Sequence, residues 1–305
     1  MAAAARAAGI EHTIGMDGLL VLRLEDGDVR ITGVAGDRAT VRASDGVATD
    51  GLLVERGERS LSVSTGGMPQ AVGHRRRGRS DDADLIVEAP VGATVVLESR
   101  SGDVRAARLT GDVRLTSASG DVSVRDAGGR LVVDAVSGDV EVTATGELDL
   151  SARTVSGDLE LRAGVVRALQ ATTTSGDITL VGTFQGDGSF SVETVSGDTA
   201  IESPRPVRIE ATTLTGDIHG PNVDHRSGGG GRPIVLGSGD GPTITFRSTS
   251  GDLSVRVADE AARRAAVAPS PPATPDRSLE VLRALERGDI DVTEATRRLS
   301  ALEEG

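Results

Sequence analysis

Aspartates that follow a glycine recur along this chain, and they are the residues whose type and spacing could do chemistry. The pairs occur in phrases such as AVSGDVEV (135–142) and TVSGDLEL (154–161), and most of their glycines are 18 to 21 residues apart. Carboxylates stacked at strand spacing would repel one another, and Ca²⁺, which prefers oxygen ligands, would relieve that repulsion. The candidate ladder consists of Asp103, Asp121, Asp139, Asp158, Asp177, Asp198, Asp217 and Asp252.

A turn at each Gly-Asp pair explains the same aspartates without any ligand. Glycine takes a positive φ without steric cost, and an Asp side chain can accept a hydrogen bond from backbone amides two residues on. The Ca²⁺-binding nonapeptide repeat carries extra glycines, and one Asp per copy supplies few of the about six to eight oxygens that the ion takes. We therefore expect turns, no metal and no cofactor, with a calcium-stabilised surface adhesin as an alternative.

A second polar cluster near the end of the repeats consists of Asp217, His219, Asp224 and His225. Paired carboxylates on the outer face of a β-helix could cleave a glycosidic bond, so a carbohydrate-active enzyme or lectin is a further alternative. Sugar sites usually stack rings on Trp or Tyr, and the chain has neither. It also lacks a phosphate loop and a Gly-x-Ser-x-Gly elbow, and so we assign no catalytic residue.

The composition excludes several classes of protein. The chain has 305 residues, a formal net charge of −13, no Cys and only three Phe. Cys-based metal sites and disulfides are excluded, and the negative charge disfavours nucleic acid as a partner. The basic run HRRRGR (74–79) is interpreted as a solvated loop.

Alternating apolar and polar residues before and after each Gly-Asp pair predict short strands. No helical crossover fits between strands so close in sequence, which leaves a sandwich or a solenoid. The repetition of Ser-Gly-Asp at one phase favours the solenoid, where each copy contacts the next. We predict an all-β fold, a parallel β-solenoid of about 19-residue coils over residues 9–258, with divergent opening coils or a cap at 9–95 and regular coils at 96–258.

The two ends of the chain differ from the repeats. Residues 1–8 are expected to be disordered, and residues 259–276 read as a Pro- and Ala-rich linker. Residues 277–303 predict a helical hairpin that is too small to be stable alone, so we expect it to bind a partner, a second copy or the solenoid end. Its apolar stripes are Leu279, Leu282, Leu285, Leu299 and Leu302.

The sequence shows no export signal. The Ala-rich start is broken by Arg6, Glu11 and His12, and no stretch of about 18 apolar residues occurs. We therefore expect a cytoplasmic protein with no transmembrane segment.

The phrases VSGDVEV and VSGDLEL resemble the bacterial putative-adhesin family, a β-strand repeat domain of unknown function, over residues 11–258. The tail VLRALERGDIDVTEATRRLSAL (281–302) resembles the short helical-hairpin domains that accompany such repeats. The resemblance implies a β-solenoid, a binding or scaffolding role, a link to envelope-stress responses and association with the cell surface. The expected function is a non-enzymatic binding protein that presents an acidic surface to a protein partner.

Overall fold

A computed structural model of the chain describes residues 9–44, 52–65, 84–221, 223–227, 233–237 and 241–257. The chain divides into two compact units, Met1–Ala258 and Asp259–Gly305, and every described residue belongs to the first. The expectations for residues 1–8, for the basic run 74–79, for the linker 259–276 and for the hairpin 277–303 lie outside the described residues.

All regular elements of the described part are β-strands, and they form one 23-stranded sheet. The opening strands are β1 (Ile10–Thr13), β2 (Leu19–Leu24), β3 (Val29–Val34), β4 (Arg38–Ala43), β5 (Leu52–Arg56), β6 (Ser60–Thr65) and β7 (Leu85–Pro90). The middle strands are β8 (Thr94–Ser99), β9 (Val104–Ala107), β10 (Val113–Ser119), β11 (Val122–Arg125), β12 (Gly129–Ser137), β13 (Val140–Ser156), β14 (Leu159–Ser175), β15 (Ile178–Phe184), β16 (Phe190–Ser196) and β17 (Thr199–Ser203). The closing strands are β18 (Arg208–Thr215), β19 (Asp217–Gly220), β20 (Val223–Ser227), β21 (Ile234–Leu236), β22 (Thr243–Ser250) and β23 (Leu253–Val257).

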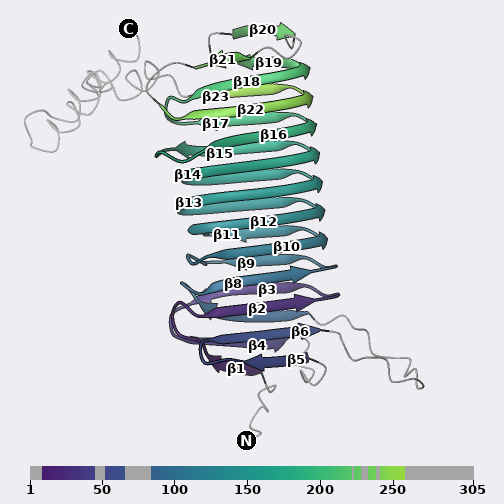
Figure 1. Ribbon diagram of the computed structural model, residues 1–305, viewed down its shortest axis with the longest axis vertical. Coiled ribbons are helices and arrows are strands. Elements are labelled where there is room, and N and C mark those ends of the chain that lie inside the picture. The colour runs from purple at the N-terminus through teal and green to yellow at the C-terminus, as the bar shows by residue number, and fades with distance from the viewer. Residues whose placement is uncertain are drawn as a thin grey trace, which may run out of the picture. The chain divides into compact units, whose positions relative to one another are not determined.

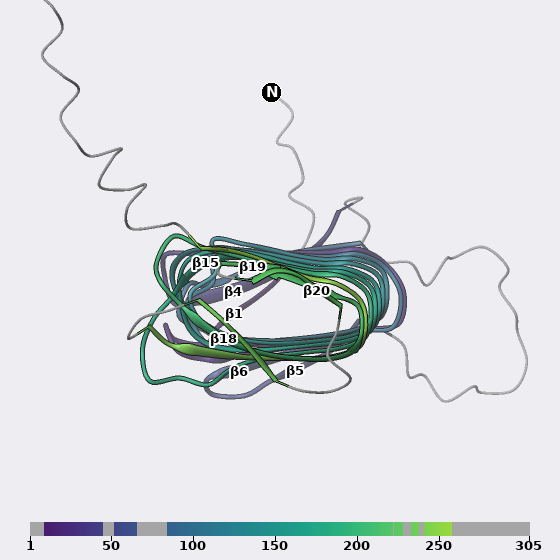
Figure 2. The same cartoon turned by 90° about the horizontal axis from the view of Figure 1, so that it is seen from above.

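Consecutive copies of the repeated phrase pair with each other in the middle of the sheet. Val122 pairs with Val140, and Val140 pairs with Leu159, both in parallel register. The strand before each Gly-Asp pair lies on one side of the core and the strand after it on the other, as the view from above shows (Figure 2). Each Gly-Asp pair therefore stands at a corner between two faces of the sheet.

The fold class predicted from the sequence, a parallel β-solenoid with a small C-terminal helical hairpin, is wrong. The sheet is mixed, and it curls round the core until it nearly closes on itself (Figure 2). Five antiparallel pairs lie at its two ends (Figure 1): β1–β4, β4–β7, β5–β6, β18–β21 and β19–β20. Antiparallel strands cover edges that a purely parallel stack would leave open. No helix occurs among the residues that the structure describes.

The order of the copies in the sheet differs from their order in the chain. Strands β2 and β3 lie between β6–β7 and β8–β9. At the other end, β22 and β23 lie between β16–β17 and β18–β19. The first and the last copies are therefore inserted into the stack rather than added to its ends.

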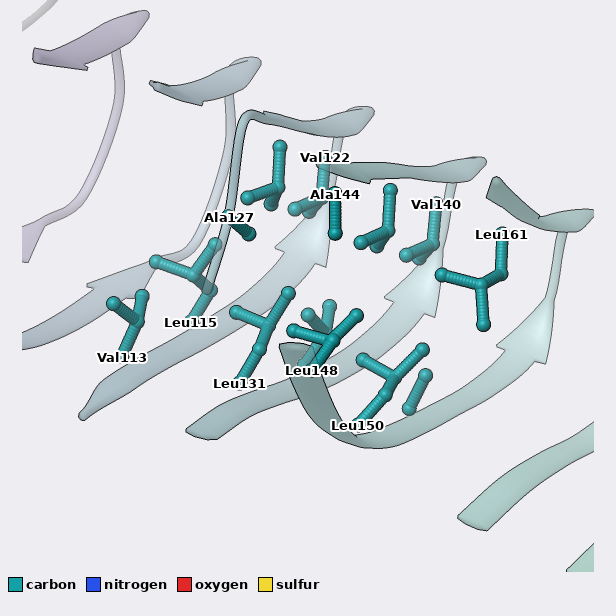
Figure 3. Close-up of a cluster of buried hydrophobic side chains, with 14 of the residues drawn as sticks. Val113, Leu115, Val122, Ala127, Leu131, Val140, Ala144, Leu148, Leu150 and Leu161 are labelled. Carbon is teal, nitrogen blue, oxygen red and sulfur yellow. The ribbon is translucent and has the colours of Figure 1, made fainter. Parts of the chain in front are cut away.

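One aliphatic core fills the space between the two faces, because every second side chain of each strand points inward. Figure 3 shows Val122, Val140 and Leu161 from one face opposite Leu115, Leu131 and Leu150 from the other. Val140 and Leu159 are buried, as the alternation predicts. Glu141, the next residue after Val140, is half-exposed. Each such Val or Leu contributes about 1.5–3 kcal/mol when it is buried.

Candidate functional site

The corner at each Gly-Asp pair is fixed by the glycine. Gly157 has a φ of 134°, in the region that other residues rarely adopt. A Cβ atom on Gly157 would also collide with the carbonyl oxygen of Gly138, the corner glycine of the preceding copy. The same clash recurs at the neighbouring corners, so only glycine lets successive copies approach this closely.

The aspartates at these corners form one continuous row. The Oδ1 atom of Asp139 accepts the backbone N–H of Asp158 at 2.9 Å, and Oδ1 of Asp158 accepts the N–H of Asp177 at 2.8 Å. These hydrogen bonds join neighbouring copies, whereas the sequence predicted local bonds within each turn. We call the set the carboxylate row, and its members in spatial order are Asp84, Asp28, Asp103, Asp121, Asp139, Asp158, Asp177, Asp198, Asp252 and Asp217.

The carboxylate row brings together all eight aspartates of the predicted ladder and adds two that sequence reasoning missed. Asp28 follows Gly27 in the phrase LEDGDVRI, which is a weaker copy of the repeat, and that Gly-Asp pair was the available signal. Asp84 follows Ala83 rather than a glycine. No local signal marked it as a member of the row.

The charges of the carboxylate row are neutralised at one end only. Arg105 lies 2.9 Å from Asp103 and 3.6 Å from Asp28. Among the described residues, no ion pair involves the row members from Asp121 to Asp217 in spatial order. Within the described part of the chain, most of the row is therefore a line of negative charge without ion-pair partners.

Ion pairs of the outer faces join arginines to carboxylates outside the row, and one of them, Arg125 with Glu141 at 3.9 Å, lies beside it. On the outer face formed by the strands that precede the corners, Arg23 pairs with Glu98 at 3.1 Å and Arg114 pairs with Asp134 at 3.3 Å. At the far end of β13 and β14, Arg167 donates to Glu147 at 2.7 Å, and this hydrogen bond raises the pKa of the Arg167 guanidinium. The faces are thus largely self-neutralised, while the row is not.

A shallow groove of about 430 Å³ runs beside part of the carboxylate row. Polar and charged side chains dominate its walls, including Glu141 and Glu160 on β13 and β14, with Arg105 and Arg125 nearby. The groove is open to solvent, and within it Ser123 donates a hydrogen bond to Glu141 at 3.2 Å. Its chemistry is that of an acidic surface that attracts cations.

A line of exposed apolar side chains runs alongside the carboxylate row, and sequence reasoning missed it. Val136, Val155, Val195 and Leu214 are each 49–55% exposed. Each stands three residues before the aspartate of its own copy, and this fixed offset was the available signal. We call the set the apolar ridge, and its members in spatial order are Ala118, Val136, Val155, Thr174, Val195, Thr249 and Leu214.

The predicted alternative cluster lies at one end of the sheet. Asp217 is a member of the carboxylate row, and His219 lies two residues further along β19. Asp224 and His225 belong to β20, which pairs with β19 in antiparallel register, and the side chains of β20 are outside the described part. Among the residues that the structure describes, no group of three His, Asp or Glu could hold a metal ion. The hairpin leucines of residues 277–303 lie outside the described part as well.

Three comparisons with solved structures show similarity at low sequence identity. The chain is similar to a putative cell adhesion protein from Clostridium sporogenes, with 10% identity, a TM-score of 0.25, and coverage of 82% of this chain and 99% of that one. A putative adhesin from Bacteroides fragilis matches with 11% identity, a TM-score of 0.32 and coverage of 81% and 96%. A putative adhesin from Parabacteroides distasonis matches with 16% identity, a TM-score of 0.30 and coverage of 81% and 96%.

A family model describes more than half of the chain. No curated protein matches this chain. No helix that could span a membrane occurs in the described ranges. The model named Toastrack DUF4097 matches residues 58–256, which include most of the strands and most of the carboxylate row. The chain therefore belongs to the Toastrack DUF4097 family.

Proposed function

We propose that this protein is a non-enzymatic binding protein and that it presents the corner edge, made of the carboxylate row and the apolar ridge, to a protein partner. The observation that carries the proposal is the exposure of the ridge. Val136, Val155, Val195 and Leu214 stand about half exposed in one line. Val136 and Val155 are direct neighbours, Thr174 and Thr249 separate the other members, and a row of exposed apolar side chains of this kind can mark a binding site.

The carboxylate row supports the same edge as a binding surface. Its aspartates cannot relax into other positions without losing the hydrogen bonds to the next copy, such as the bond from Asp177 N–H to Asp158. Because these carboxylates are already held in place, they lose little further side-chain conformational entropy when a partner binds. The outer faces offer less, since their arginines and carboxylates already pair with each other.

An enzymatic function is less well supported by the site. The row carboxylates from Asp84 to Asp252 in spatial order each accept a backbone N–H, and the groove beside the row is open rather than enclosed. Enzymes that hydrolyse glycosidic bonds need one carboxyl group as an acid and a second one across the scissile bond, at a separation that also admits the attacking water where the mechanism is inverting. We therefore retain binding as the proposed activity.

Site-specific cross-linking tests the proposed edge. A photoreactive residue at Val155 or Val195 should give an adduct with one discrete protein in host cells. The same residue at Val96 or Val181, half-exposed positions on the outer faces, should not. Equal adducts at all four positions, or none at the ridge, would contradict the proposal.

From the resemblance of the repeats, we propose a role in a bacterial envelope-stress response, tested by comparing stress-gene induction with and without the protein.

For residues 277–303 we propose a second interaction module. Light scattering on the full chain and on residues 1–258 should show a loss of assembly on truncation, and an unchanged mass together with unchanged partner binding would contradict it.

A further inference from the structure

The corner edge is apolar along one side and anionic along the other. Each ridge residue precedes an aspartate of the row by three positions, as Val155 precedes Asp158 and Val136 precedes Asp139. The two lines therefore run side by side across the same copies. A partner that covers both lines needs apolar and cationic side chains along adjacent sides of one rod-like element.

The length and spacing of the apolar ridge match an α-helix. Paired parallel strands are about 4.8 Å apart, so the six steps from Ala118 to Leu214 cover about 29 Å. An α-helix rises about 5.4 Å per turn, and about 20 residues cover 30 Å. Each turn of such a helix would meet about one copy of the repeat.

An added β-strand does not fit this edge. The strands that carry the ridge already pair on both sides, as β13 does with β12 and β14. Their backbone N–H and C=O groups are used within the sheet, and a strand that adds to a sheet needs such groups free. A partner must therefore be recognised through side chains.

A second copy of this chain does not fit either. The formal net charge of the chain is −13, and two corner edges would place one carboxylate row against another. Like charges in register oppose association. The occupant must carry positive charge.

Resting on the proposed function, we infer that the partner contributes a cationic amphipathic α-helix of about 20 residues that lies along the corner edge. Its apolar side chains contact Val136, Val155 and Val195. Its Arg or Lys side chains face Asp139, Asp158 and Asp177, which have no ion pair among the described residues.

The test measures binding of synthetic helical peptides to the full chain by fluorescence anisotropy. One peptide of about 20 residues carries Leu at helical spacing on one face and Arg beside it. The comparison peptide has the same composition in an order that is not amphipathic. We expect the first peptide to bind and the second to bind about tenfold or more weakly, and we expect salt to weaken binding.

Two variants of the corner edge, each with a control variant, test whether the peptide binds at that edge. The triple variant D139N/D158N/D177N removes three charges but keeps an oxygen acceptor at each corner. Its control E98Q/D134N/E193Q removes three carboxylates from the outer face. The variant V136S/V155S/V195S removes the ridge, and L53S/V235S removes exposed apolar side chains elsewhere. We expect each edge variant to bind the amphipathic peptide about tenfold more weakly, while both controls bind as the unmodified protein does.

The outcomes separate the partner inference from the proposed function. Equal weakening by the edge variants and by the controls would overturn the inference, since net charge alone would then explain binding. Binding that appears only after Arg75, Arg76, Arg77 and Arg79 are changed to Gln would also overturn it, because the chain's own basic run would be the occupant. If neither peptide binds but cross-linking at Val155 still yields a discrete partner, the inference fails and the proposed function stands. If both fail, the corner edge is not a binding surface.

Discussion

The carboxylate of Asp139 accepts the backbone N–H of Asp158 at 2.9 Å, so a side chain of one copy satisfies the main chain of the next. The corner glycines Gly138 and Gly157 of the same two copies approach so closely that no side chain fits between them. Charge, close approach and backbone pairing are thus coupled at one position of the repeat. Substitutions at Gly157 and at Asp139 separate the close approach from the charge and the hydrogen bond.

Replacing the corner glycine should be among the most destabilising single changes. Gly157→Ala combines a φ of 134° with a clash against Gly138, and we expect a loss of about 3 kcal/mol or more in unfolding free energy. Gly36→Ala has a φ of 131° without a neighbour within 4 Å, so about 1–2 kcal/mol is expected. Gly146→Ala, which meets neither obstacle, should change stability by less than about 0.5 kcal/mol. Urea unfolding measures all three, and an equal effect at the three positions would refute the packing argument.

The hydrogen bond of the carboxylate row should matter more than its charge. Asp139→Asn keeps an oxygen that can accept the N–H of Asp158, and it removes a charge from a row of like charges, so little loss is expected. Asp139→Ala removes the acceptor and should cost about 1 kcal/mol. Thermal melting of both variants distinguishes the cases. An equal loss for Asn and for Ala would show that the charge, and not the acceptor oxygen alone, stabilises the corner.

Calcium should have no effect on stability. One oxygen of every row carboxylate from Asp84 to Asp252 in spatial order accepts a backbone N–H, and the described residues contain no cluster that could hold a metal. A chelator in excess should therefore leave the melting temperature unchanged, with magnesium as the control cation. A rise in melting temperature on adding calcium that is lost in D139N/D158N/D177N would favour the calcium-stabilised alternative, by ligand linkage.

The inward and outward positions should respond in opposite ways to charge. Val140→Asp places an unpaired carboxylate in the core, where Val140 is only 1% exposed, and should cost several kcal/mol. Glu141→Lys changes a half-exposed position and loses a 3.2 Å contact with Ser123 and an exposed 3.9 Å ion pair with Arg125, so a change of at most about 1 kcal/mol is expected. Chemical denaturation of the two variants compares them directly. The reverse order of effects would mean that the register of β13 is wrong.

A buried hydroxyl group should be removable with a gain in stability. Thr173 Oγ1 is buried and has no hydrogen-bond partner among the described residues. Thr173→Val keeps the shape and removes an unsatisfied polar atom, so we expect a gain of about 1 kcal/mol. Thr213→Val is the matched control, because Thr213 Oγ1 donates to the carbonyl of Thr215 at 2.9 Å and that bond would be lost. A loss of stability in both variants would indicate a buried water at Thr173.

Part of the corner edge could be predicted from the residues alone. Glycine at a positive φ is the only residue that suits these corners, so the spacing of Gly-Asp pairs marked the corners reliably. The alternation around Val140 and Leu159 predicted which side chains point inward, since a strand has a period of two. The apolar ridge was missed although the same alternation points Val136 and Val155 outward, directly after the buried Ala135 and Thr154, because in the sequence they look like ordinary strand valines.

The sequence by itself determined where the chain turns and which side of each strand is apolar, because both depend on local backbone and side-chain preferences. Only the tertiary structure decided which copies are neighbours. Every copy offers nearly the same edge, so sequence could not show that Asp252 lies between Asp198 and Asp217, or that Asp28 follows Asp84. The antiparallel strands at the two ends were decided in the same way, since pairing of an open edge depends on which segment can reach it. The carboxylate row follows from that stacking, because each of its hydrogen bonds joins two copies that are 18 or more residues apart in the chain.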